Sequence, residues 1–143
     1  MNKHFAGIAG AVALAFLAVG CGSSSSSSSG TGSCLLTQSS VVLLCVGFDY
    51  SGSSSDQSAL TSECQTAGLT FQAQACSTTN AVAGHCNVPQ ATLNSEGVTT
   101  SVSNVEAIFY TTANFTPATA QSTCEAAFTG GSTGGLGGTW VSG

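Results

Sequence analysis

Basic residues are almost absent from this chain. Lys3 is its only lysine or arginine, against six aspartates and glutamates, so the formal net charge is −5. Removing Lys3 with the first residues takes this charge from −5 to −6. Nucleic-acid binding and attraction to anionic lipid both depend on lysine and arginine. The composition therefore argues against nucleic acid as a partner and against a membrane surface held by basic side chains.

Several motifs of catalytic and metal sites are missing as well. No C-x-x-C pair occurs, and His85 is the only histidine after His4, whereas structural zinc sites use closely spaced ligand pairs. No G-x-S-x-G motif places a serine nucleophile, and the glycine-rich segment 129–138 lacks the G-K-[ST] of a phosphate-binding loop. We expect no metal ion, no cofactor and no catalytic residue.

The first 20 residues are typical of a secretory signal peptide. A short basic start, Met1 to His4, precedes an uncharged apolar run from Phe5 to Val19 that is followed by a small residue. This run is about 15 residues long, whereas a bilayer-spanning helix needs roughly 20. We therefore expect cleavage, with an uncleaved anchor helix as the alternative.

At the end of this run, Leu17–Cys21 (LAVGC) resembles the lipobox of bacterial lipoproteins. The resemblance covers the first 21 residues only. It implies cleavage before Cys21, which would carry a diacylglycerol on its thiol and a further acyl chain, such as palmitate, on its amino group. Ala18 departs from the pattern, in which leucine is commonest at that position. Gly22 stands where lipoproteins kept in the inner membrane often carry aspartate, so the resemblance favours the outer membrane.

The chain is expected to divide into three parts. These are a signal peptide at 1–20, a lipidated cysteine with a Gly/Ser tether at 21–33, and one globular domain at 34–143. The tether contains no apolar side chain and cannot form a core. Acyl chains on Cys21 would hold the exported domain to the membrane, since each buried methylene contributes about 0.8 kcal/mol.

Six cysteines lie in the expected domain, namely Cys34, Cys45, Cys64, Cys76, Cys86 and Cys124. An even number in a small exported domain predicts three disulfides, and sequence alone leaves their pairing open. Predicted strands at 69–75 and 81–88 would place Cys76 and Cys86 at the ends of a hairpin. We expect these two cysteines to pair.

Two short helices are predicted, at 57–67 and 117–128. Asp56 and Thr116 are suitable N-cap residues, and a proline follows the second of them in the first turn. Gly68 stands where a glycine commonly ends a helix.

Apolar or alternating runs predict strands at 41–50, 69–75, 81–88, 98–103 and 105–112. In the third of these strands, Val82, Cys86 and Val88 should share one face, with His85 opposite Cys86. The fold class is therefore α+β: a small disulfide-rich domain with two short helices on a mixed or antiparallel sheet.

The sequence also contains a weak internal repeat. Tyr50 precedes Cys64 by fourteen residues, and Tyr110 precedes Cys124 by the same number, so the two pairs are offset by 60. A duplicated strand–helix–strand unit would explain this offset. Coincidence in a chain rich in serine, threonine and alanine is the alternative.

Four side chains are candidates for function. His85 is the only histidine of the expected mature chain, and Asp49 and Glu106 hold related positions in two predicted strands. A cleft that gathers these three residues would indicate a hydrolase. Trp140, beside the glycine-rich segment, could make an exposed ligand contact.

The missing motifs favour a non-enzymatic structural or interaction role in the cell envelope. The alternative is a module that binds envelope polysaccharide or peptide, or a hydrolase that acts on them. The envelope partner or glycan is not indicated by the sequence.

Overall fold

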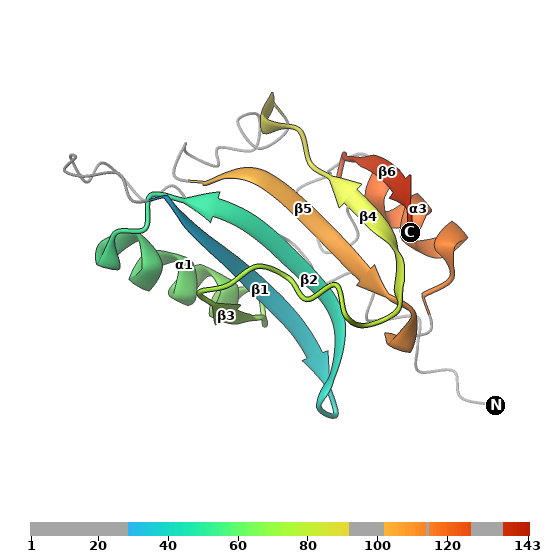
Figure 1. Ribbon diagram of the computed structural model, residues 1–143, viewed down its shortest axis with the longest axis horizontal. Coiled ribbons are helices and arrows are strands. Elements are labelled where there is room, and N and C mark those ends of the chain that lie inside the picture. Colours follow the sequence, from blue (N-terminus) through green and yellow to red (C-terminus); the bar gives the residue numbers. More distant parts are fainter. Residues whose placement is uncertain (1–28, 92–101, 114, 127–135) are drawn as a thin grey trace.

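Six strands form one antiparallel sheet in the order β3-β1-β2-β5-β4-β6 (Figure 1). This computed structural model describes residues 29–91, 102–113, 115–126 and 136–143. The strands are β1 (Gly30–Gln38), β2 (Val41–Tyr50), β3 (Thr70–Gln72), β4 (Val82–Asn87), β5 (Val102–Tyr110) and β6 (Thr139–Ser142). The predicted α+β class with an antiparallel sheet is confirmed, although the sheet dominates.

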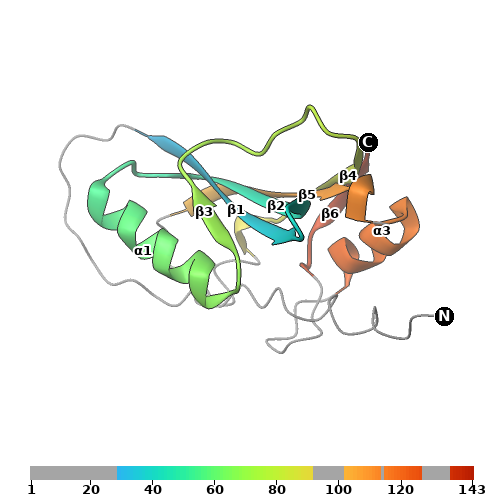
Figure 2. The ribbon, with the colours of Figure 1, turned by 90° about the horizontal axis from the view of Figure 1, so that it is seen from below.

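Two α-helices, α1 (Ser54–Thr66) and α3 (Pro117–Glu125), lie against the same face of the sheet (Figure 2). A single-turn 3-10 helix, η2 (Thr111–Ala113), follows β5. The extended connection between β3 and β4, residues 73–81, crosses the opposite face, and we call it the strap. Within the described parts of the chain, no helix has the length and apolar character needed to cross a membrane.

Helix α1 begins three residues earlier than predicted. Its N-cap is Ser53, whose side chain accepts a hydrogen bond from the backbone N–H of Asp56, so Asp56 lies in the first turn instead of capping it. A carboxylate in the first turn is still favourable, because the helix N-terminus is electropositive. Gly68 ends the helix as predicted, at a φ of +75° that glycine adopts without strain.

Helix α3 begins where the sequence predicted. Thr116 is its N-cap, and Thr116 and Thr119 form a reciprocal capping box. The helix ends at Glu125, so Ala126 is not helical, and the predicted last residues 127–128 lie outside the described residues.

Four of the predicted strand runs are found as three strands, with small changes that include the end of 105–112, where residues 111–112 belong to η2. The run 41–50 forms β2, 81–88 contains β4, and β5 joins the last residues of 98–103 to 105–110. The predicted residues 98–101 lie outside the described part of the chain. The run 69–75 was too long, because β3 ends at Gln72 and the exposed residues that follow belong to the strap.

Strand β1 was not predicted, and its first residues were assigned to the tether. Gly30–Ser33 instead pair with β2, and Ser33 is fully buried. A Cβ atom on Gly32 would lie 3.0 Å from the ring of Phe48 and 3.1 Å from that of Phe71. The missing side chain leaves room for these rings, so a segment without apolar side chains still packs in the sheet.

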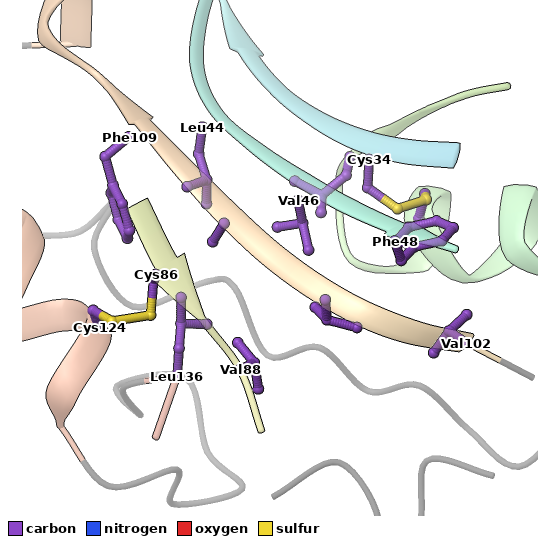
Figure 3. Packing of buried hydrophobic residues seen from close by; sticks show 14 of the residues in the cluster. Cys34, Leu44, Val46, Phe48, Cys86, Val88, Val102, Phe109, Cys124 and Leu136 are labelled. Atoms are coloured by element: carbon purple, nitrogen blue, oxygen red, sulfur yellow. A yellow bond between two sulfur atoms is a disulfide. The ribbon is translucent and has the colours of Figure 1, made fainter. Parts of the chain in front are cut away.

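The main core lies between the sheet and the helices. Leu44, Val46 and Phe48 alternate along β2 toward this inner face, on the same side as Cys34 and Cys86 (Figure 3). Val82 was predicted to share that face but packs on the other one. A β-bulge between Val82 and Gly84 reverses the alternation there, whereas His85 lies opposite Cys86 as predicted.

Three disulfides connect the six cysteines of the domain, as predicted. Cys34–Cys64 joins β1 to α1, Cys86–Cys124 joins β4 to α3, and Cys45–Cys76 joins β2 to the strap. The predicted Cys76–Cys86 pair was wrong. Strand β3, which precedes Cys76, pairs with β1 at one edge of the sheet, whereas β4 lies near the other edge.

The two halves of the sheet contain their elements in the same order. Strand–strand–helix–strand describes β1-β2-α1-β3 and also β4-β5-α3-β6. The cysteine bonded to the helix lies opposite an aromatic residue of the edge strand in both halves: Cys34 opposite Phe71, and Cys86 opposite Trp140. Corresponding positions are thus defined by register.

The predicted offset of 60 residues does not describe this correspondence along the strands. Tyr50 belongs to the main core on the inner face, whereas Tyr110 packs on the opposite face. By register, the residue opposite Cys34 in β2 is Val46, and the residue opposite Cys86 in β5 is Ala107, an offset of 61.

Candidate functional site

The face of the sheet opposite α1 and α3, the outer face, is covered in one part by the strap. Under it lies a small apolar cluster of three buried residues, Cys45, Ile108 and Tyr110. Half-buried apolar side chains surround this cluster, namely Leu35, Val42, Cys76 and Val82. In Figure 1 the strap crosses in front of β1 and β2 before it enters β4.

Three residues from three strands hold residues 74–77 of the strap, and Thr111 of η2 bonds the last strap residue, Ala81. The hydroxyl of Ser33 in β1 donates to the backbone oxygen of Gln74 at 2.8 Å, and Cys45 in β2 bonds covalently to Cys76. The hydroxyl of Tyr110 in β5 donates to the backbone oxygen of Ser77 at 2.6 Å. Burial raises the pKa of Tyr110, so this hydroxyl stays protonated and remains a donor.

Beyond the strap, the outer face carries polar side chains. His85 of β4 and Glu106 of β5 lie together, with 2.9 Å between His85 Nδ1 and Glu106 Oε1. Their side chains are 26% and 42% exposed, so water screens this pair. Asp49 of β2 lies on the same face. The three residues singled out from the sequence are therefore on one surface, which we call the polar patch.

Asp49 is held by two neighbours that the sequence did not indicate. Asn104 Nδ2 donates to Asp49 Oδ2 at 2.8 Å, and Thr31 Oγ1 donates to Asp49 Oδ1 at 3.3 Å. Asn104 has a φ of +51°, at a bulge where β5 shifts its register against β2. Asparagine tolerates this conformation better than most residues. A single asparagine in an alternating run gives no sign of such a bulge, so its role could not be found from sequence.

The polar patch pairs one imidazole with a carboxylate. The carboxylate of Glu106 is the partner of His85 Nδ1, and this bond fixes the orientation of the imidazole. The described parts of the chain hold no group of three or more His, Cys, Asp or Glu side chains that could share a metal ion. What the patch offers is acceptor oxygens and one imidazole on an extended surface.

Trp140 does not form an open aromatic platform. It is half-buried, lies over Gly84 on the inner face, and packs against Phe109 with 5.9 Å between ring centroids. The neighbouring side chain of Val141 is 46% exposed. Trp140 therefore contributes to the packing of the β6 edge.

Comparisons with known proteins give no relative: no protein-family model, no curated protein and no solved structure matches this chain.

Proposed function

We propose that this chain is an exported lipoprotein, anchored to the outer membrane through Cys21, whose disulfide-bonded domain serves as a non-enzymatic interaction module of the cell envelope. The observation that carries the proposal is the use of the seven cysteines. Six of them pair within the domain, and an oxidising compartment is where such bonds persist. Cys21 is the seventh, and the lipobox resemblance gives it a lipid.

The tether in this proposal is shorter than the sequence suggested. Since β1 begins at Gly30, only residues 22–29 separate Cys21 from the sheet. A Gly/Ser segment of this length averages roughly 16 Å between its ends. The domain would be held close to the headgroups, and a net charge of −6 without lysine or arginine would keep it from lying on anionic lipid.

An interaction role is favoured over hydrolysis by the polar patch itself. His85 and Glu106 are hydrogen-bonded to each other, and Asp49 accepts from two donors. Binding of an envelope polysaccharide or peptide is the form of interaction that such acceptors would serve. Incubation with purified peptidoglycan should release no new reducing ends or amino groups, and release that Glu106→Gln abolishes would contradict the non-enzymatic proposal.

The anchor is tested by intact mass. Protein extracted from host membranes should begin at Cys21, carry acyl additions, and show six alkylated cysteines only after reduction. The control is Cys21→Ser, which should be recovered in the soluble exported fraction with the same three disulfides. An unmodified Cys21, or a signal segment still attached, would overturn the lipoprotein proposal and leave the disulfide framework standing.

We also propose that the two halves derive from a duplicated unit, which the matching element order and the strand-to-helix disulfide of each half support. The unit then includes a strand before the predicted strand–helix–strand. Duplication would give the sheet two corresponding outer surfaces, one of which the strap occupies.

A further inference from the structure

The strap-covered surface and the polar patch occupy corresponding positions in the two halves. Ser33 comes directly before Cys34, the cysteine of β1 that is bonded to α1. His85 comes directly before Cys86, the cysteine of β4 that is bonded to α3. Ser33 and His85 therefore correspond.

The other two strap-holding residues follow the same register. Cys45 precedes Val46 in β2 as Glu106 precedes Ala107 in β5, so Cys45 corresponds to Glu106. Tyr110 lies three residues after Ala107, as Asp49 lies three residues after Val46. The three residues that hold the strap thus correspond, one for one, to the three residues of the polar patch.

The way in which the sheet binds the strap therefore indicates which kind of segment the polar patch can bind. It is an extended segment that crosses β1, β2 and β5, and two of its backbone carbonyls accept hydrogen bonds from Ser33 and Tyr110. In the other half the corresponding path crosses β4, β5 and β2, where His85 and Glu106 keep part of their surface exposed. In Figure 1 no described segment crosses in front of the upper ends of β2 and β5.

We propose that His85, Glu106 and Asp49 bind an extended, basic peptide segment of another envelope protein, laid across β4, β5 and β2 as the strap is laid across β1, β2 and β5. This inference names a partner for the interaction role proposed above and rests on that role, but not on the lipid anchor.

Charge identifies the partner as basic. Where the strap-covered surface has Cys45 and Tyr110, the polar patch has Glu106 and Asp49. Two carboxylates thus stand in place of a disulfide-bonded cysteine and a phenol. The expected mature chain has no lysine or arginine, so it cannot supply cations of its own to this surface. A complementary surface must come from another molecule, and charges at such a rim act mainly on encounter and specificity.

The backbone of the partner would be recognised as that of the strap is. Because Nδ1–H of His85 donates to Glu106, the Nε2 atom on the exposed edge of the imidazole can accept from a peptide N–H, at the position where the hydroxyl of Ser33 donates to the backbone oxygen of Gln74. Lysine or arginine side chains at alternate positions would then point to the same face of the extended segment. Glu106 and Asp49 would accept from them.

The test measures binding of a fluorescein-labelled peptide of four Lys-Thr repeats by anisotropy. The protein is the full chain as the host processes it, extracted from membranes in a non-ionic detergent. Asp49→Asn/Glu106→Gln should weaken binding about tenfold, because two exposed charge pairs are lost. The matched control, Glu63→Gln/Glu125→Gln, removes two charges from the helices and should change affinity by less than about twofold. Both variants should keep three disulfides and the far-UV circular dichroism of the parent.

Each other outcome overturns the inference. Equal losses in both variants would mean that overall charge attracts the peptide without a site. Equal binding of a Glu-Thr repeat peptide would mean that the sheet recognises backbone alone. Binding of a neutral oligosaccharide that Asp49→Asn/Glu106→Gln abolishes, without peptide binding, would assign the patch to glycan.

This result is separable from the anchor experiment. If the peptide fails to bind while Cys21 carries lipid, the inference is wrong and the anchored module stands. If the parent chain with Cys21 intact is itself recovered unlipidated from the exported fraction and binds the peptide, the anchor is wrong and the patch stands.

Discussion

The two halves of the sheet attach their helices in the same way but use the outer face differently. Each helix buries only two residues, Leu60 and Cys64 in α1, Ala120 and Cys124 in α3, and one of each pair is the cysteine bonded to the sheet. Short helices with so little buried surface are marginal by themselves. The disulfide is therefore a principal attachment of each helix, and both halves depend on it.

On the outer face the halves diverge. The first half covers Cys45 and Ser33 with a segment of the chain itself, closed by a disulfide, whereas the second half leaves Glu106 and His85 in contact with water. The residues of the main core and the disulfides that attach the helices lie on the inner face, where the two halves agree. The residues of the outer face and their covering differ between the halves. The interaction site that we propose lies on the outer face, with His85 and Glu106 in the second half and Asp49 in β2.

The largest expected effect comes from removing either strand-to-helix disulfide. Cys34→Ala/Cys64→Ala and Cys86→Ala/Cys124→Ala open loops of similar length, with sequence separations of 30 and 38. Each should lower the free energy of unfolding by about 3–4 kcal/mol, and the two should differ by less than about 1 kcal/mol. Urea unfolding followed by circular dichroism measures both. A large difference would show that the two attachments are not equivalent.

The next comparison concerns the glycines beneath the edge-strand aromatics. A Cβ on Gly84 would lie 2.2 Å from the ring of Trp140, whereas a Cβ on Gly32 would lie 3.1 Å from that of Phe71. Gly84→Ala must therefore displace the indole and should cost about 2–3 kcal/mol, as overpacking does. Gly32→Ala needs only a small shift and should cost about 1 kcal/mol. Thermal unfolding gives the order, and a Gly32→Ala more harmful than Gly84→Ala would contradict it.

The same glycines show what the sequence could and could not reveal. The apolar run 41–50 predicted β2, the N-cap residue Thr116 predicted the start of α3, and the even cysteine count predicted the three disulfides. The start of β1 was missed because Gly30–Ser33 offers no apolar pattern. Its packing depends on rings that come from β2 and β3, far away in the sequence.

The disulfide pairing and the polar patch were limited by strand order. Cys76 and Cys86 are neighbours in sequence, but local spacing cannot tell that β3 returns to β1 while β4 joins β5. Asp49 and Glu106 were expected at related strand positions, but by register Asp49 corresponds to Tyr110 and Glu106 to Cys45. Asn104, the partner of Asp49, was not expected there, since a bulge that turns one side chain leaves no periodic signal.

The disulfide of the strap, Cys45–Cys76, should differ from the other two in its rate of reduction. Cys76 is the only one of the six cysteines that is not buried, and exchange with a thiol requires access to a sulfur. Cys45–Cys76 should be reduced several-fold faster than the other two. Tyr110→Phe removes the hydrogen bond to Ser77, worth about 1 kcal/mol, and should accelerate this reduction further.

The measurement is timed alkylation during reduction, followed by peptide mapping of the six cysteines. Thr111→Val serves as a control, since it removes the 3.2 Å side-chain hydrogen bond to Ala81 at the other end of the strap and leaves the cover over Cys76 in place. If Cys34–Cys64 or Cys86–Cys124 opened first, the strap would not be the weaker attachment.

The smallest expected effect is a difference in how stability depends on pH between substitutions in the two helices. Burial raises the pKa of Glu63 in α1 above its ordinary 4.5, whereas Glu125 in α3 is exposed and hydrogen-bonded to Gln121. In the folded state Glu63 binds its proton more tightly than in the unfolded state, so stability falls as pH rises through the window above 4.5. Glu63→Gln should therefore be more stable than the parent at pH 7 and equal to it near pH 3. Urea midpoints at both pH values measure this, with Glu125→Gln as the control that should show no such gain. An equal gain from both substitutions would trace the effect to the net charge of the protein and not to the burial of Glu63.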